Sequence, residues 1–241
     1  MTDVQLPPRL AAIADEVPVC TLAADIGTDH ALLPAFLLQS CRAKRVLASD
    51  IAPGPLARAR ETLLRHGLLD RAKLLLSDGL QAAEAYAPDV LIIAGMGGET
   101  IRNILSASDY PMQSSAYLVL QPNTHAELLR AYLYQAGFEI LRERAVRQGK
   151  HFYLILVAQA PRTPVPKTPT TAELFLGALQ PDTAENTAYL RLQLRRCMSA
   201  LRQIQKSAQP NADRQSRLTQ IIQEAERRLQ ERSYESHDDC C

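Results

Sequence analysis

Short apolar runs alternate with segments of helical periodicity between Val19 and Ala160. Several of the runs have the length of strands and lack a polar alternate face, which is typical of strands buried on both sides. The segments between them place apolar residues three and four positions apart, as helices do. This alternation predicts a parallel sheet covered by helices on both faces. The expected strands are 19–25, 45–50, 73–78, 89–95, 116–121, 138–146 and 151–159, and the expected helices are 31–40, 54–67, 80–87, 99–107 and 126–137.

The last two expected strands are joined by the short segment "RQGK". Parallel neighbours need a crossover of about a dozen residues or more, whereas a connection of this length makes a hairpin. We therefore expect an α/β fold with a doubly wound, mostly parallel seven-stranded sheet that contains one antiparallel strand.

A second module follows a proline-rich stretch. The segment "APRTPVPKTPT" breaks every periodicity, because proline removes a hydrogen-bond donor and biases the preceding residue to extended geometry. Beyond it, two apolar seams separated by "SAQPNAD" predict an antiparallel helical hairpin. We expect a sheet domain at 1–160 and a linker with a C-terminal helical hairpin at 161–241. The seams are Leu190, Leu194, Cys197, Leu201 and Ile204, then Leu218, Ile222, Ala225 and Leu229.

Length and charge restrict the function classes. A chain of 241 residues that is 46% hydrophobic can bury a full core. Its formal net charge of +1 gives the whole molecule no strong attraction to polyanions, so nucleic-acid binding would need a local basic patch. No run approaches the roughly 18 apolar residues of a membrane span.

The cysteines indicate a reducing compartment. Their number is odd, they show no framework spacing, and the start "MTDVQLPPRL" lacks an apolar signal segment, so we expect a cytoplasmic protein. The terminal "SHDDCC" offers adjacent thiols, which rarely complete a tetrahedral metal shell, and we expect no metal. The cysteines are Cys20, Cys41, Cys197, Cys240 and Cys241.

Acidic residues follow the first three expected strands. In doubly wound sheets, ligands bind outside the carboxyl ends of the strands where the winding direction reverses. A dinucleotide needs several glycines in the first turn, but "DIGTDH" has one, and Asp29 would repel phosphate oxygens. A ligand with a cationic centre and a ribose suits these carboxylates better, which points to S-adenosylmethionine.

Each carboxylate then has an expected partner on that cofactor. Asp50 would accept hydrogen bonds from the ribose hydroxyls, Asp78 from the adenine amino group, and Asp25 would orient the turn and the ammonium group. The alternative is that acids at strand ends only cap the following helices. The expected cofactor-binding residues are Asp25, Gly27, Asp50, Ile51, Asp78, Gly79 and Gly95.

The segments "ADIGTDHALLP", "ASDIAPGPLARA", "SDGL", "IAGMGG" and "LVLQPN", in this order and spacing, resemble the bacterial tRNA (adenine-22-N1)-methyltransferase family, a branch of the Rossmann-like S-adenosylmethionine-dependent methyltransferases. The resemblance runs from about Leu10 to Val157 and implies methyl transfer to N1 of an adenine in tRNA. Thr62 stands where Asn is common in the family and Leu75 where Arg is common, which puts the exact substrate position in doubt more than the cofactor.

The resemblance implies an acceptor pocket lined by "AGMGG" and "QPN". N1 lies on the pairing edge of adenine, so the base must be unpaired or extruded to reach it. Glycines let a flat base approach the backbone, and amides can bond its edge. The structural alternatives are a glycine turn that opens a helix, a Met that fills the core, and a His held by hydrogen bonds. The expected catalytic or substrate-orienting residues are His30, Asp29, Met96, Gly97, Gln121 and Asn123.

Two basic stretches could meet a tRNA. A charged face on a hairpin often serves only solvation, but we expect the hairpin to contact RNA in a monomeric enzyme. Two rival functions remain: methyl transfer to another RNA position or a small molecule, and cofactor binding without turnover in an interaction protein. The first stretch holds Arg191, Arg195, Arg196, Arg202, Lys206, Arg214 and Arg217, and the sheet domain offers Arg58, Arg60, Arg65, Arg142, Arg144, Arg147 and Lys150.

Overall fold

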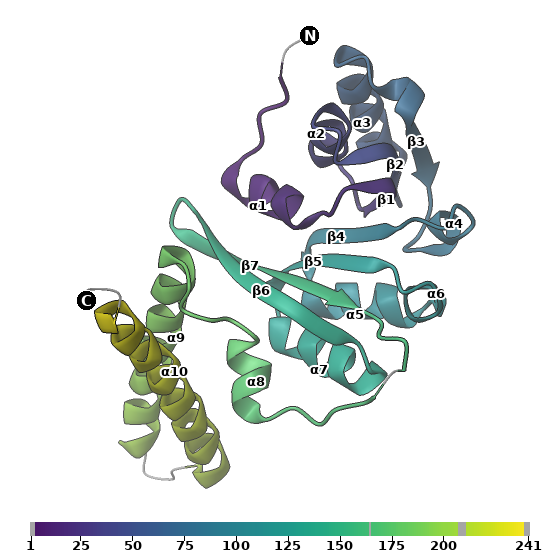
Figure 1. Cartoon of the computed structure of the whole chain (residues 1–241). Coiled ribbons are helices and arrows are strands. Elements are labelled where there is room, and N and C mark those ends of the chain that lie inside the picture. The colour runs from purple at the N-terminus through teal and green to yellow at the C-terminus, as the bar shows by residue number, and fades with distance from the viewer. Residues whose placement is uncertain (1–2, 164, 207–210, 239–241) are drawn as a thin grey trace.

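A seven-stranded sheet forms the centre of the molecule, as Figure 1 shows for the computed structural model, which describes residues 3–163, 165–206 and 211–238. The strands are β1 (Cys20–Ile26), β2 (Ala43–Asp50), β3 (Ala72–Leu76), β4 (Val90–Gly97), β5 (Tyr117–Thr124), β6 (Glu139–Gln148) and β7 (His151–Gln159). Their order is β3-β2-β1-β4-β5-β7-β6, and β7 is antiparallel to both of its neighbours. The predicted doubly wound, mostly parallel sheet with an antiparallel strand is confirmed.

Helices cover both faces of the sheet, and alternate strand residues point to opposite faces. Along β4, Leu91 and Ile93 enter one apolar cluster, whereas Val90 and Ile92 enter the other. Both faces are therefore buried, as the uninterrupted apolar strands require. The helices are α1 (Pro8–Glu16), α2 (Leu32–Gln39), α3 (Pro53–Arg65), α4 (Gln81–Glu84), α5 (Gly98–Ser106), α6 (Tyr110–Gln113), α7 (Ala126–Ala136), α8 (Thr171–Leu176), α9 (Ala184–Gln205) and α10 (Ala212–Asp238), with a short 3-10 turn at Leu69–Arg71.

Two strands extend further than the sequence predicted. We expected the fourth strand to end at Gly95 and the fifth at Gln121, but β4 continues to Gly97 and β5 to Thr124. Their pairing resumes after a register shift, with Met96 opposite Pro122. The "AGMGG" and "QPN" segments therefore reach the edge of the sheet as paired strand ends, which fixes their positions.

Three helices, α1, α6 and α8, lie outside the predicted set, and α1 and α8 each carry a local signal. Helix α1 begins with Pro8, a residue that suits the first helical turn because its missing N–H is not needed there. Helix α8 begins with a capping box, in which the Thr170 hydroxyl accepts from the Glu173 N–H and the Glu173 carboxylate accepts from the Thr170 N–H. Helices α1 and α8 each position a candidate functional surface.

Helices α9 and α10, here called the arm, confirm the predicted helical pair. They lie side by side and run in opposite directions (Figure 1). Leu190 and Cys197 of α9 and Ile221 and Ala225 of α10 belong to the same apolar cluster as the strands, so the arm packs on the sheet. The connection at 207–210 lies outside the described residues, and the domain boundary at residue 160 stays a prediction.

A buried ion pair joins α7 and α8 to the sheet. The Arg130 guanidinium of α7 donates to the Glu143 carboxylate of β6, with Nη2 2.6 Å from Oε2, and the two side chains are 1% and 0% exposed. Its Nη1 donates to the carbonyl oxygens of Leu174 and Phe175 in α8. One guanidinium therefore connects three elements that are distant in sequence.

A second buried arginine holds the segment after α8 from the other side. Nη1 of Arg228 in α10 donates to the carbonyl oxygens of Gly177 and Leu179, at 2.9 and 2.8 Å. Gly177 has a φ of 66°, and a Cβ there would overlap the carboxylate of Glu143, so only glycine fits. We call Arg130, Glu143 and Arg228 the arginine clamp.

Membrane and metal features were also sought in the described part of the chain. None of its helices combines the length and the apolar character needed to cross a membrane. Within the described residues, no group of three or more His, Cys, Asp or Glu side chains is placed to hold a metal ion. Cys240 and Cys241 lie outside the described residues.

We predict that Glu143→Gln lowers the free energy of unfolding by about 3–5 kcal/mol, because it leaves the Arg130 charge buried without its counterion. Urea unfolding followed by circular dichroism measures this change. Glu99→Gln, which removes the exposed pair with Arg102, is the matched control and should change the stability by less than about 1 kcal/mol. Equal effects of the two substitutions would contradict a structural role for the buried pair.

Candidate functional site

The candidate site lies where the winding of the sheet reverses, between β1 and β4. The crevice outside the carboxyl ends of such a strand pair is the usual ligand site of doubly wound folds. Gly27 follows β1 with a φ of 79°, and a Cβ at this position would overlap the methyl carbon of Met96 from β4. Gly27 therefore leaves room for the flexible Met96 side chain, which lies over the backbone turn after β1.

The three predicted carboxylates follow three adjacent strands along this edge. Asp25 ends β1 in a buried position, Asp50 ends β2, and the exposed Asp78 follows β3. An oxygen of Asp50 accepts from the N–H of Ala52, which fixes this side chain. Beside it, Ile51 is 72% exposed, an unusual position for a large apolar side chain unless a ligand covers it. We call the three aspartates Asp25, Asp50 and Asp78 the carboxylate edge.

Asp25 carries the strongest electrostatic perturbation of the site. Its pKa is raised from 3.8 to about 6, because the effects of burial and of the neighbouring Asp50 charge outweigh those of Thr28 and Arg9, which lower it. A buried carboxylate that still ionises at neutral pH gains stability from a cation placed beside it. The carboxylate edge is thus suited to a positively charged ligand.

A cavity of about 270 Å³ opens beside Asp78, between the loop after β3 and helix α5. Asp78 and Gly79 line one side, and Thr100, Asn103 and Ile104 line the other. Gly79 has a φ of 55°, which brings the backbone close to the cavity. Asp78 therefore places a carboxylate at the wall of a cavity next to the carboxyl end of β3.

Across the crevice, a chain of hydrogen bonds orients the amides of β5. Nη1 of Arg9 donates to Oε1 of Gln121 at 2.6 Å, Nε2 of Gln121 donates to Oδ1 of Asn123 at 3.0 Å, and Nδ2 of Asn123 donates to the carbonyl oxygen of Gly95 at 2.7 Å. Gln121 is 0% exposed, whereas Asn123 is exposed. Of the two predicted amides, Asn123 faces the crevice and Gln121 holds it from beneath.

Arg9 is the site residue that the sequence analysis missed. It lies on α1, before the first predicted element, and contacts Gln121 across 112 positions of sequence. Its N–H also donates to Gln148, and its guanidinium lies over the Tyr153 ring. The proline at the start of α1 predicts a helix, but no local pattern places Arg9 in the site.

A glycine at the start of α5 brings the ends of β4 and β5 into backbone contact. A Cβ on Gly98 would overlap the carbonyl oxygen of His125, so the start of α5 packs directly on the end of β5. His125 has a left-handed φ of 53°, an uncommon conformation for a residue with a side chain. Gly95, Gly97, Gln121 and Asn123 therefore form one rigid surface, which we call the amide wall.

Asp29 and His30 lie in the loop between β1 and α2, at the same edge. Oδ1 of Asp29 accepts from Arg58 of α3, and its other oxygen lies 3.6 Å from Nε2 of His30. Both side chains are about half exposed. The structure brings them to the crevice mouth, and a catalytic role for either stays a prediction.

Comparison with known proteins gives the chemistry of this arrangement. The family described as "Methyltransferase domain" matches residues 6–156. The tRNA (adenine(22)-N(1))-methyltransferase of Bacillus subtilis is 33% identical over 160 residues, which cover 66% of this chain and 67% of that protein.

Solved structures agree over nearly the whole chain. The crystal structure of the B. subtilis m1A22 tRNA methyltransferase TrmK has a TM-score of 0.77 and 26% identity, covering 94% of this chain and 100% of that one. The Streptococcus pneumoniae protein Sp1610 in complex with S-adenosyl-L-methionine has a TM-score of 0.75 and 27% identity, covering 93% and 100%. This chain belongs to the methyltransferase-domain family and, within it, to the tRNA (adenine(22)-N(1))-methyltransferases.

Proposed function

We propose that this protein transfers a methyl group from S-adenosylmethionine to N1 of an adenine in tRNA. The carboxylate edge beside the turn at Gly27 carries the proposal, because it matches a cationic donor that also bears a ribose and an adenine. The B. subtilis relative, named tRNA (adenine(22)-N(1))-methyltransferase, supports the reaction, and the S. pneumoniae complex supports the donor.

The residues at the edge fit the parts of this donor. Asp50 would accept from the ribose hydroxyls, and the cavity beside Asp78 would take the adenine. The buried Asp25 would meet the ammonium group or the turn that holds it. When bound, S-adenosylmethionine supplies a methyl group on a positively charged sulfur, so every one of these carboxylates favours its binding.

The backbone and apolar contacts complete the donor site. Gly27, Gly79 and Gly95 all have positive φ angles and let the ligand approach the chain. The exposed side chain of Ile51 would cover one face of the bound ring. These assignments agree with those expected from the sequence and remain to be tested by mutation.

The acceptor would lie against the amide wall. Neutral adenine already has a lone pair on N1, so no side chain has to remove a proton before the transfer, and the protein's task is positioning. Asn123 has used one lone pair of its oxygen and one N–H within the wall, which leaves one of each for the edge of a base. Met96 and Gly97 would contact the ring, and His30 and Asp29 would flank it.

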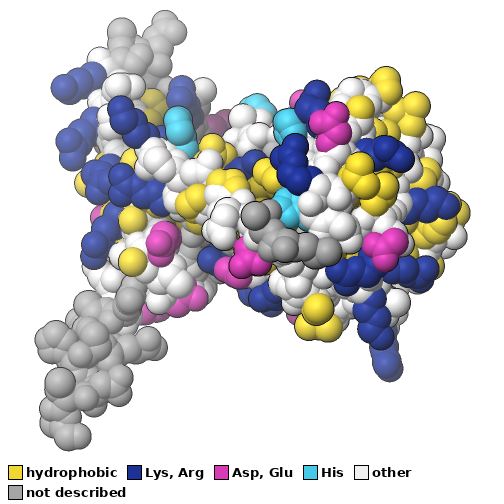
Figure 2. All heavy atoms as spheres, turned by 90° about the horizontal axis from the view of Figure 1, so that it is seen from above, with side chains coloured by type: hydrophobic (Ala, Val, Ile, Leu, Met, Phe, Trp, Pro, Cys, Tyr) yellow, Lys and Arg dark blue, Asp and Glu magenta, His cyan; other side chains and the backbone are white. Residues whose placement is uncertain are grey.

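The arm supplies the cations for an RNA backbone. Figure 2 shows Lys and Arg side chains gathered over the lobe where α9 and α10 lie. Three arginines expected on the sheet domain are paired, since Arg142 and Arg144 contact Glu16 and Arg58 contacts Asp29. By contrast, no salt bridge to a described residue is formed by any of the arm arginines 191, 195, 196, 202 and 217. We therefore assign the arm to phosphate contacts.

We also place the protein in the cytoplasm, as a monomer. Cys20, Cys41 and Cys197, the cysteines of the described residues, are free thiols, which supports a reducing compartment. The two departures from the family's pattern leave the carboxylate edge intact: the Thr62 hydroxyl donates within α3, and Leu75 packs at the margin of the core.

Incubation with methyl-labelled S-adenosylmethionine and unmodified tRNA should place label on N1 of an adenine, located by nuclease digestion and mass spectrometry. Label on another RNA atom or on a small molecule would favour the first rival function. Donor binding without any label transfer would favour a non-catalytic interaction protein.

Asp25→Asn should weaken donor binding by about 10- to 100-fold, the effect of losing a charge-assisted hydrogen bond, as measured by calorimetry at pH 8. The same change should stabilise the free protein by up to about 3 kcal/mol at pH 8, because the folded pKa of about 6 lies above the unfolded value of 3.8 and charging the buried group costs stability. This stability gain should shrink as the pH falls from 6 toward 4.

Asp50→Asn is the matched control for Asp25→Asn, since it removes a carboxylate from the same edge at a less buried position. It should weaken donor binding but stabilise the free protein less, because the Asp25 carboxylate stays buried. If Asp25→Asn leaves donor affinity unchanged, the carboxylate edge is not the donor site.

Arg9→Ala should lower kcat by about 10- to 100-fold with little change in donor affinity at pH 8, because the Gln121 amide loses the group that orients it. The loss should vanish in a Gln121→Ala background, where the orientation is already gone. Arg42→Ala, which removes a guanidinium bonded to the Val17 carbonyl instead, is the control. Additive losses from Arg9→Ala and Gln121→Ala would refute a positioning role through Gln121.

A further inference from the structure

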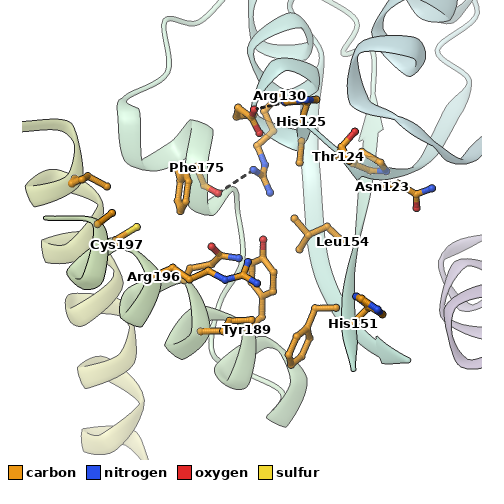
Figure 3. Close-up of a pocket in the computed structure, with 18 of the residues that line it drawn as sticks. Asn123, Thr124, His125, Arg130, His151, Leu154, Phe175, Tyr189, Arg196 and Cys197 are labelled. Atoms are coloured by element: carbon orange, nitrogen blue, oxygen red, sulfur yellow. Dashed lines mark hydrogen bonds and ion pairs between the residues drawn. The ribbon is translucent and has the colours of Figure 1, made fainter. Parts of the chain in front are cut away.

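A groove of about 560 Å³ lies between the sheet and the arm, outside the donor site (Figure 3). Its walls come from the end of β5, the start of α7, the start of β7, helix α8 and one face of α9. Asn123 lines the groove and also bonds the carbonyl oxygen of Gly95 in the amide wall. The groove therefore begins where the acceptor site ends.

The charged side chains in the groove favour an anion. Lys150, His151 and Arg196 line it, and none of them forms a salt bridge with a described residue. The acidic side chain among the lining residues, Glu127, lies 3.2 Å from Nδ1 of His125. The charge that remains available in the groove is positive.

Aromatic rings lie in the same groove. Phe152 of β7 and Tyr189 of α9 meet edge to face with their centroids 5.8 Å apart, and both are partly exposed. Figure 3 shows Tyr189 and Arg196 reaching from α9 into the space that Leu154 of β7 faces. An aromatic platform beside cations is the usual composition of a site for a nucleobase with its phosphate.

The groove is held open by the arginine clamp. The Arg130 guanidinium, part of its lining, is fully engaged with Glu143 and with the carbonyl oxygens of α8. Because α8 and the arm are fixed to the sheet by these buried bonds, the spacing between Phe152 and α9 is set before any ligand binds. A prebuilt groove loses little conformational entropy on binding.

We propose that this groove binds the RNA nucleotide next to the target adenine, with its base against Phe152 and Tyr189 and its phosphate against Arg196 and Lys150. The proposal rests on the proposed function, since it places the target base at the amide wall. An extruded adenine at Asn123 leaves its neighbour in the strand at the mouth of the groove. Stacking of that neighbour would compensate for part of the energy of extrusion.

Arg196→Ala tests the phosphate contact, with Arg195→Ala as its matched control. Both remove one positive charge from the same turn of α9, but only Arg196 lines the groove. We expect Arg196→Ala to lower kcat/KM for tRNA by about 10-fold or more and Arg195→Ala by less than about 3-fold, the general effect of one arm charge. Donor affinity, measured by calorimetry, should stay the same in both, which also shows that the variants are folded.

Phe152→Leu tests the base contact in combination with modified RNA. RNA with an abasic residue on one side of the target adenine, the side whose base occupies the groove, should bind the wild type about 5- to 100-fold more weakly. This range corresponds to the loss of one stacked base. The same RNA should bind Phe152→Leu no more weakly than unmodified RNA does, because the platform is already lost.

RNA binding, measured by filter binding at two salt concentrations, does not depend on methyl transfer. It therefore separates failure of the groove from failure of the proposed function. If RNA is bound but not methylated, the proposed function fails while the binding comparison still tests the groove. Equal losses for Arg196→Ala and Arg195→Ala, or tolerance of an abasic residue at both flanks, would overturn the groove and leave the methyltransferase proposal standing.

Discussion

The buried pair of Arg130 and Glu143 is the interaction on which the functional geometry depends. A guanidinium and a carboxylate removed from water lose much hydration energy, and they are stable only when every donor and acceptor is matched. The two side chains achieve this by drawing in α7, β6 and the carbonyl oxygens of α8, and Gly177 leaves the necessary space. An ion pair that must be completed in this way fixes α8 against the sheet more firmly than apolar packing alone, and Arg228 of α10 joins the arm to the segment that follows α8.

That fixed position lets one nearly neutral chain present two surfaces of opposite charge. The net charge of +1 conceals an acidic edge after β1, β2 and β3 and a basic arm beyond β5. If these surfaces overlapped, the basic side chains would repel the cationic donor and the carboxylates would repel the RNA. The point where the sheet reverses its winding lies between them, and there Arg9 and Asp25 influence each other across the crevice. The separation of charge along the sheet would thus match the cationic donor to the acidic edge after β1, β2 and β3, and the RNA to the basic arm.

Features set by local pattern were predictable, and features set by distant contacts were not. The strand at 151–159 has its predicted bounds because its apolar run is bounded on both sides by polar residues. The acids could be placed together because parallel strands end at one edge. By contrast, nothing near Arg9 indicates Gln121, and nothing near Arg142 or Arg144 indicates that Glu16, about 130 positions away, occupies them. Only once these pairings were known could Arg142 and Arg144 be distinguished from the arm arginines.

The chemistry explains why the distant contacts matter so much here. An acceptor nitrogen with a free lone pair asks for no acid or base, so the rate depends on how well the protein holds N1 in line with the donor. Extruding a base costs energy, and that energy has to come from contacts made elsewhere on the RNA. The contacts proposed for the groove and the arm would therefore act on kcat as well as on affinity. On this proposal the amide wall can remain simple, a few hydrogen bonds fixed by Arg9, because contacts outside it would present the base.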